Sequence, residues 1–122
     1  MSWCRISYRM SGKLAELTER QLYALRKRLA AGVEDPAVTL RGALVSDMRR
    51  CSGEGCRCRR GELHGPYSYL TVYSSGRSRM VYVPKAIAAV AAEHVQATRR
   101  SEALLLEISQ VNVELLRRRA LR

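Results

Sequence analysis

The spacing of hydrophobic residues changes along the chain and predicts where helices and strands lie. Near the N-terminus, apolar residues recur at the spacing of one helix face: Leu22, Leu25 and Leu29. Thr18 and Gln21 have the form of a capping box, in which each side chain bonds the backbone N–H of the other residue. Gly32 suits the end of such a helix. We therefore expect an N-terminal helix within residues 13–32, after a loose tail of residues 1–12.

The middle of the chain alternates in the way that β-strands do. Residues 42–50 predict one strand, and residues 67–73 and 78–83 predict a hairpin around Ser75 and Gly76. A two-residue loop there divides the side chains between two faces. The aliphatic face is a natural seat for a helix and carries Leu70, Val72, Val81 and Val83. The opposite face, called the tyrosine face below, carries Tyr67, Tyr69, Tyr73, Met80 and Tyr82.

After the sheet, the sequence predicts one long helix over residues 85–122. Pro84 suits its first turn, and neither Gly nor Pro follows. Four residues of its second half step by three and four, as in a coiled-coil seam: Leu105, Ile108, Asn112 and Leu115. A small sheet cannot bury this seam, so it should pair with the N-terminal helix, a second copy of the chain or another protein. Asn112 would either fix the register of a paired helix or lie exposed on the helix flank.

The composition indicates one small basic domain. The 122 residues include 22 basic and 11 acidic side chains, which gives a net charge of +11. Such a charge favours nucleic acid as the partner, then an anionic membrane surface, and otherwise means a solvated basic surface. No stretch approaches the roughly 18 apolar residues that cross a bilayer, and the start lacks the apolar run of a secretory signal. We therefore expect a cytoplasmic protein, in which thiols stay reduced.

The candidate metal chemistry is concentrated in the pattern Cys-x4-Cys-x-Cys-x5-His. Three thiols and one imidazole are the usual ligands of a closed tetrahedral zinc site: Cys51, Cys56, Cys58 and His64. The alternatives are a disulfide or redox pair, an iron–sulfur cluster, and a His64 that only caps a turn. We predict one structural Zn²⁺ in a zinc knuckle, within a sheet domain of residues 42–95. A closed site leaves no position for a reactive water, and no phosphate-binding loop is present, so we do not expect an enzyme.

Basic and aromatic residues around the knuckle suggest a nucleic-acid surface. The candidate phosphate contacts are Arg49, Arg50, Arg57, Arg59, Arg60, Arg77 and Arg79. The candidate stacking residues are Tyr69, Tyr73 and Tyr82, for which half-buried sheet packing is the ordinary alternative. The leading prediction is a non-enzymatic accessory or regulatory factor that binds nucleic acid, with DNA favoured over RNA. The alternative is an assembly or adaptor protein that dimerises, or recruits a larger DNA-processing partner, through its C-terminal helix.

Together, the elements predict an α+β fold in which a small three-stranded antiparallel sheet is flanked by an N-terminal helix and a long C-terminal helix. Residues 42–116 also resemble a family of small, functionally uncharacterised prokaryotic proteins. The shared motifs are Gly-x-Leu-Val before a basic run, the three cysteines, His-Gly-Pro-Tyr-x-Tyr-Leu, Tyr-Val-Pro-Lys and a leucine-rich helical tail. The chain departs from the pattern at Ser52, where the family has Gly, and Gly53 takes over the turn. The resemblance implies a domain type and carries no activity with it.

Overall fold

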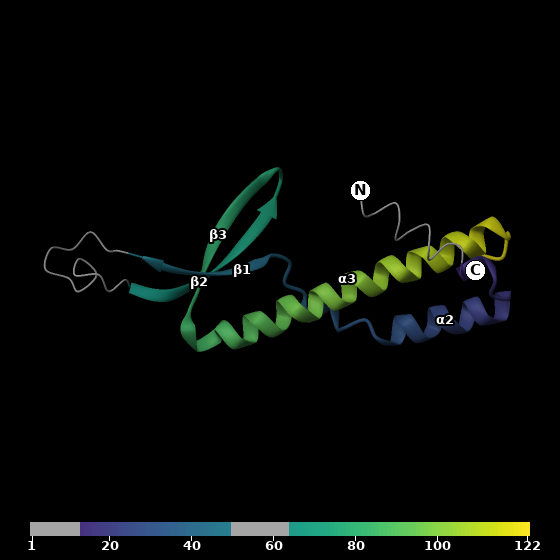
Figure 1. Ribbon diagram of the computed structural model, residues 1–122, viewed down its shortest axis with the longest axis horizontal. Coiled ribbons are helices and arrows are strands. Elements are labelled where there is room, and N and C mark those ends of the chain that lie inside the picture. The colour runs from purple at the N-terminus through teal and green to yellow at the C-terminus, as the bar shows by residue number, and fades with distance from the viewer. Residues whose placement is uncertain (1–12, 50–63) are drawn as a thin grey trace, which may run out of the picture. The chain divides into compact units, whose positions relative to one another are not determined.

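A computed structural model describes residues 13–49 and 64–122, and these residues form two units. The helical unit comprises residues 13–35 and 99–122, and the sheet unit comprises the described part of residues 36–98. The elements are α2 (Glu19–Ala31), η1 (Pro36–Val38), β1 (Ala43–Arg49), β2 (His64–Ser74), β3 (Arg77–Val83), η3 (Lys85–Ile87) and α3 (Ala88–Arg117) (Figure 1). This is the predicted α+β fold, with a three-stranded antiparallel sheet, a shorter N-terminal helix and a long C-terminal helix.

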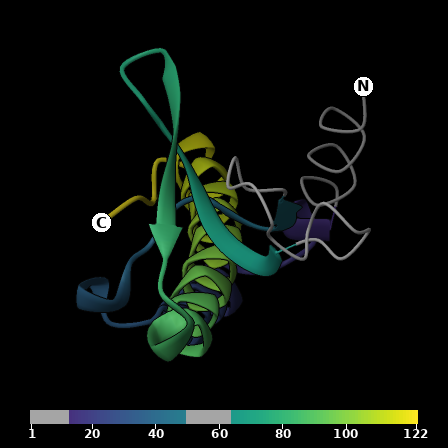
Figure 2. The same cartoon turned by 90° about the vertical axis from the view of Figure 1, so that its left-hand side faces the viewer.

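The sheet has the strand order β1-β2-β3, and both strand pairs are antiparallel. Figures 1 and 2 show β2 and β3 as a hairpin. Its register pairs Tyr73 with Ser78 and Tyr69 with Tyr82, which the two-residue loop requires. Ser75 and Gly76 in that loop have positive φ angles of 53° and 76°, as a turn matched to the strand twist requires.

A small apolar core lies on one face of the sheet. Leu70, Val83 and Val95 are buried there, so the first part of α3 packs on the aliphatic face, as the sequence predicted. The partly buried residues around them are Leu40, Leu44, Val72, Ala88 and Ala91. The buried Thr98 hydroxyl donates to the His94 carbonyl oxygen and accepts the backbone N–H of Leu40 at 2.8 Å. This contact fixes the segment before β1 to the helix.

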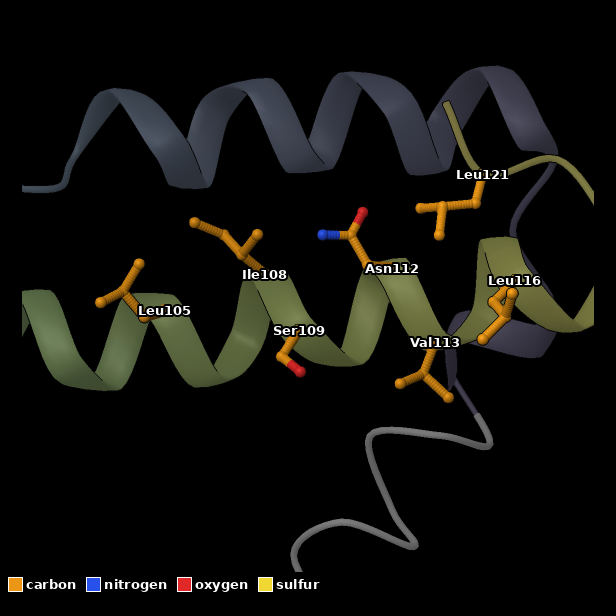
Figure 3. A pocket seen from close by; sticks show the side chains of 7 residues that line it. All are labelled: Leu105, Ile108, Ser109, Asn112, Val113, Leu116 and Leu121. Atoms are coloured by element: carbon orange, nitrogen blue, oxygen red, sulfur yellow. The ribbon is translucent and has the colours of Figure 1, made fainter.

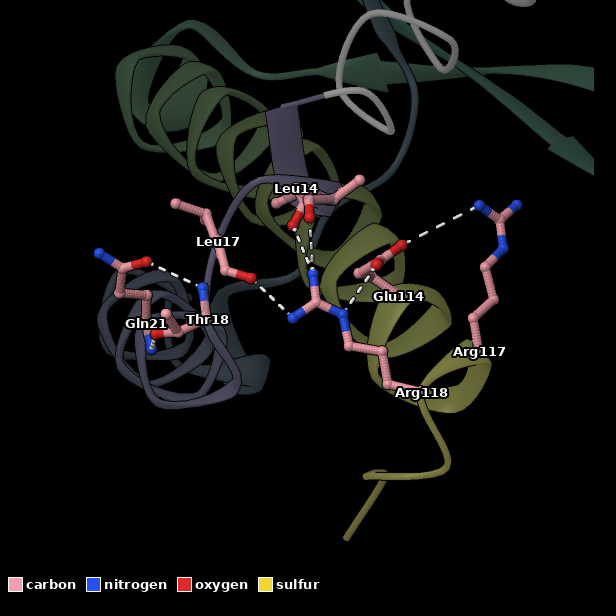
Figure 4. A network of polar contacts seen from close by, with 8 residues as sticks. Leu14, Leu17, Thr18, Gln21, Glu114, Arg117 and Arg118 are labelled. Atoms are coloured by element: carbon pink, nitrogen blue, oxygen red, sulfur yellow. Dashed lines mark hydrogen bonds and ion pairs between the residues drawn. The ribbon is translucent and has the colours of Figure 1, made fainter.

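In the helical unit, α2 begins with the predicted capping box. The Thr18 hydroxyl accepts the N–H of Gln21, and the Gln21 amide oxygen accepts the N–H of Thr18 (Figure 4). The helix therefore starts at Glu19, whereas the sequence allowed a start at Lys13. Residues 13–15 are also helical, and a turn at Glu16 and Leu17 separates them from α2.

The core of the helical unit lies between α2 and the last part of α3. Its buried residues are Leu14, Leu22, Val111 and Leu115. Gly32 caps α2 with a φ of −85°, so its backbone does not require glycine. A Cβ at Gly32 would instead lie 3.0 Å from the Leu104 side chain. The glycine therefore leaves room for close packing of the two helices.

The C-terminal helix ends at Arg117, five residues before the end that the sequence predicted. Arg119 has a left-handed φ of 56°, and the N–H of Ala120 donates back to the Leu115 carbonyl at 2.8 Å. This is a Schellman arrangement, in which Arg119 takes the position usually held by glycine. The Tyr23 hydroxyl donates to the Ala120 carbonyl and holds the tail against α2.

The side chain of Arg118 joins the end of α3 to the turn that precedes α2 (Figure 4). Its guanidinium donates to the carbonyl oxygens of Leu14, Ala15 and Leu17 at 3.1, 3.1 and 2.6 Å. It also bonds the Glu114 carboxylate at 2.9 Å, and both side chains are largely buried. None of the helices in residues 13–49 and 64–122 combines the length and hydrophobicity that a membrane span needs.

Candidate functional site

Of the four predicted zinc ligands, only His64 is among the residues that the structure describes. Cys51, Cys56 and Cys58 lie outside them, as do four of the predicted phosphate contacts: Arg50, Arg57, Arg59 and Arg60. His64 is the first residue of β2, and its Cα is paired with that of Arg49, the last residue of β1. β1 and β2 are therefore paired as far as the two residues that border the segment 50–63, which contains the three cysteines. Within the described residues, no group of His, Cys, Asp and Glu could hold a metal ion.

The tyrosine face of the sheet presents aromatic and apolar side chains to solvent. Tyr73, Tyr82 and Met80 have exposed fractions of 74%, 53% and 52%. The Tyr69 ring meets the Tyr82 ring edge to face, with centroids 5.8 Å apart. On the other side of Tyr69, β1 places Val45, which is also exposed. The three strands thus align a row of large side chains on the face opposite the buried core.

The arginines of β3 do not share that face. Arg77 and Arg79 are paired with Ser74 and Val72 and alternate with Tyr82 along the strand. They therefore lie on the same side as the aliphatic residues, near the hairpin turn, and both are exposed. The alternation of residues along β3 already predicts that the two arginines and Tyr82 lie on opposite faces. The predicted nucleic-acid surface, which combined them, did not take this alternation into account.

The four predicted seam residues have different surroundings. Leu115 is fully buried in the core with Leu22 of α2, so part of the seam pairs within the chain. The Asn112 side-chain oxygen accepts a hydrogen bond from Arg26 of α2 at 3.0 Å. Leu105 is 53% exposed, and Ile108 is partly buried.

Leu105, Ile108 and Asn112 line an open pocket of about 300 Å³ on the surface of the helical unit (Figure 3). The complete lining, called the α3 groove below, is Leu105, Ile108, Ser109, Asn112, Val113, Leu116 and Leu121. Four of these residues were not among the predicted site residues. Val113 follows Leu105 and Ser109 at helical spacing, which is the signal that could have identified it.

Comparisons with curated proteins and with solved structures found no match for this chain. A family model, described as a domain of unknown function (DUF6788), matches residues 14–92. The match covers α2, the three strands and the start of α3. It agrees with the expected resemblance to a functionally uncharacterised family. Because the match extends over more than half of its length, the chain belongs to the DUF6788 family.

Proposed function

We propose that the protein is a non-enzymatic, zinc-binding protein that binds nucleic acid, with unpaired bases stacked on its tyrosine face. The observation that supports this function is the exposure of Tyr73 and Tyr82 beside Tyr69. Exposed aromatic rings on a sheet are the usual platform for single strands, since every base has a face that can stack. Buried packing, the ordinary role of tyrosine in a sheet, does not account for side chains that are more than half exposed.

The charge of the chain supports an anionic ligand of this kind. The net charge is +11, and phosphate contacts by basic residues supply most of the sequence-independent affinity for nucleic acid. Arg77 and Arg79 lie on β3, which also carries Tyr82. If the bases of a nucleic-acid strand stack on Tyr82, its phosphates would pass beside β3 and approach these two arginines. DNA and RNA share this chemistry, and DNA is the form that we favour.

The zinc site is proposed to hold the cysteine-containing segment in one conformation. Cys51, Cys56, Cys58 and His64 supply three thiolates and an imidazole, the set that tetrahedral Zn²⁺ takes in structural sites. The pairing of His64 with Arg49 supports this, because Cys51 follows Arg49 by only two residues. Such a set of reduced thiols fits a cytoplasmic protein, which is the location that we propose.

Removal of one exposed tyrosine ring tests the stacking surface. Tyr73→Ala and Tyr82→Ala should each weaken binding to an oligo-dT single strand by about 1–3 kcal/mol, while Tyr82→Phe should bind as the parent does. Binding to a blunt duplex should change little, because its bases are not free to stack. The measurement is fluorescence anisotropy at two salt concentrations.

Val81→Ala is the matched control for these variants. Val81 is adjacent to Tyr82 and 47% exposed, but it lies on the opposite face of the sheet. This variant should bind the single strand as tightly as the parent chain. Equal affinity of the Tyr73→Ala, Tyr82→Ala and parent chains for the single strand would rule out the tyrosine face as the binding surface.

A second function, assembly through the C-terminal helix, is favoured by the α3 groove. Leu105 and Leu116 are exposed on a helix whose neighbouring face already packs on α2. In this function the zinc segment is only structural, and the helical unit meets the partner. The two functions are separable, because variants of the groove leave the tyrosine face intact.

A further inference from the structure

The β2–β3 hairpin extends farther than the third strand of the sheet. β1 begins at Ala43, which pairs with Thr71, so among the described residues the part of β2 after Thr71 has only β3 beside it. Residues 72–79 thus form a two-stranded ribbon that closes in the turn at Ser75 and Gly76 (Figures 1 and 2). This ribbon is called the hairpin arm below. A Cβ at Gly76 would meet no atom within 4 Å, so no other part of the described chain packs on that side of the tip.

The two faces of the hairpin arm carry different chemistry. Tyr73 lies on the tyrosine face and is 74% exposed. The opposite face continues outward from the buried Val83, on which α3 packs, and ends on Arg79 and Arg77. Both arginines are exposed, and so is Val81 between them and Val83. The cover of α3 therefore ends before the arginines, and the arm presents an aromatic side and a guanidinium side.

The guanidinium side is not neutralised by the rest of the described chain. Neither Arg77 nor Arg79 forms an ion pair with another described residue. Residues 64–92, which include all of β2 and β3, contain no Asp and no Glu. Two arginines two positions apart on a strand lie roughly 6.6 Å apart, so they can act together on one anionic ligand. The arm therefore carries a positive potential of its own.

A single strand on the tyrosine face does not use the guanidinium side of the arm. Such a strand approaches the two arginines only past the edge of β3, because they lie on the opposite face. The shape of the arm indicates the other ligand. The major groove of B-form DNA is about 12 Å wide and admits a two-stranded β-ribbon, whereas the minor groove is only about 6 Å wide. Arginine is the side chain that most often contacts guanine in the major groove, and it also binds phosphate.

We infer that the hairpin arm enters the major groove of duplex DNA with its guanidinium side, while the tyrosine face holds the single strand that leaves that duplex. The ligand of the sheet unit is then a junction of double-stranded and single-stranded DNA. The inference rests on the proposed function, which supplies the single-stranded half of this ligand. It also separates DNA from RNA, since the major groove of an RNA duplex is too deep and narrow for side chains to read.

Fluorescence anisotropy with three labelled probes tests the junction: an oligo-dT single strand, a blunt DNA duplex and the same duplex with an oligo-dT tail. Because two linked sites bind a linked ligand more tightly than either part, the parent chain should bind the tailed duplex about tenfold or more above either simple probe. An RNA duplex with an oligo-U tail should gain little affinity from its duplex part. An equal preference for the tailed RNA would contradict the assignment to the major groove.

A variant that carries both Arg77→Gln and Arg79→Gln removes the two charges of the arm and keeps polar side chains. It should lose the preference for the tailed duplex. The dependence of blunt-duplex affinity on salt should become shallower by about 0.9 for each lost phosphate contact. The matched control carries Arg20→Gln and Lys85→Gln, which remove two exposed charges outside the arm, and it should keep the preference. Since all four side chains are exposed, circular dichroism should show the parent fold in both variants.

A parent chain that binds the tailed duplex no better than the oligo-dT strand would overturn the inference. So would an arginine variant that keeps the preference, or a control variant that loses it, because net charge and not the arm would then be responsible. These outcomes differ from failure of the proposed function, in which Tyr73→Ala and Tyr82→Ala bind oligo-dT as the parent chain does.

Discussion

Arg118 shows how one side chain can stabilise the helical unit. Its guanidinium makes hydrogen bonds to three backbone carbonyl oxygens and to the Glu114 carboxylate, and only 23% of the side chain is exposed. The planar group presents five N–H donors in a fixed fan, whereas an ammonium has three donors on a flexible stem. A lysine at this position would keep the charge but leave some of the carbonyl groups without a donor.

Arg118→Lys should therefore lower the free energy of unfolding by about 1–3 kcal/mol, the cost of leaving buried hydrogen-bonding groups unsatisfied. Urea denaturation followed by circular dichroism measures this change. Arg117→Lys is the matched control, since the Arg117 side chain is 65% exposed and lies 4.0 Å from the same carboxylate, farther than Arg118 at 2.9 Å. It should change stability by less than about 0.5 kcal/mol. Equal effects of the two substitutions would show that charge alone, and not the hydrogen-bonding pattern, is what matters.

At the scale of elements, the sequence predicted the sheet and the cap of α2 better than the end of α3. The hairpin register follows from alternation and from the turn at Ser75 and Gly76, both of which are local signals. The end of α3 could not be predicted in this way, because Arg119 adopts the backbone conformation in which glycine is expected.

The surroundings of the predicted site residues were harder to predict than the elements. Helical spacing identified Leu115 and Leu105 alike, but spacing does not say which neighbour covers each residue. The structure buries Leu115 against α2 and leaves Leu105 exposed. For the sheet, alternation alone separates Arg79 from Tyr82, so their placement on opposite faces was within reach of the sequence.

The glycine that precedes β1 provides a test of strand packing. A Cβ at Gly42 would lie 2.7 Å from the Thr71 carbonyl oxygen and 2.9 Å from the Leu70 side chain, and the φ angle there is 156°. Since a backbone oxygen within the sheet cannot move aside cheaply, Gly42→Ala should destabilise the chain by about 1–3 kcal/mol. Thermal unfolding measures the effect.

Gly76→Ala provides the comparison for Gly42→Ala. Its φ is also positive, at 76°, but no atom lies within 4 Å of the added Cβ. Only the backbone cost of about 1–2 kcal/mol should apply there. A Gly42→Ala variant as stable as the parent chain would contradict the close approach of Gly42 to β2.

At the scale of the whole molecule, the zinc proposal predicts one Zn²⁺ per chain. Cys56→Ser should lose the metal and much of the sheet unit, because metal affinity in such a site is also folding free energy. Elemental analysis and circular dichroism measure the two effects. The control is Cys4→Ser, which changes a thiol outside the predicted ligand set and should keep both zinc and fold. A folded parent chain that contains no zinc and does not respond to a chelator would exclude the site.

The open sheet has a further consequence for the solubility of the chain. With the order β1-β2-β3, one row of backbone N–H and C=O groups on β3 has no neighbouring strand among the residues that the structure describes. Such a row can template strand addition from another molecule, which leads to aggregation. Arg77 and Arg79 place two positive charges on this exposed strand. Because a second copy would bring the same positive charges to the same edge of the sheet, the two arginines oppose growth of the sheet by self-addition at β3.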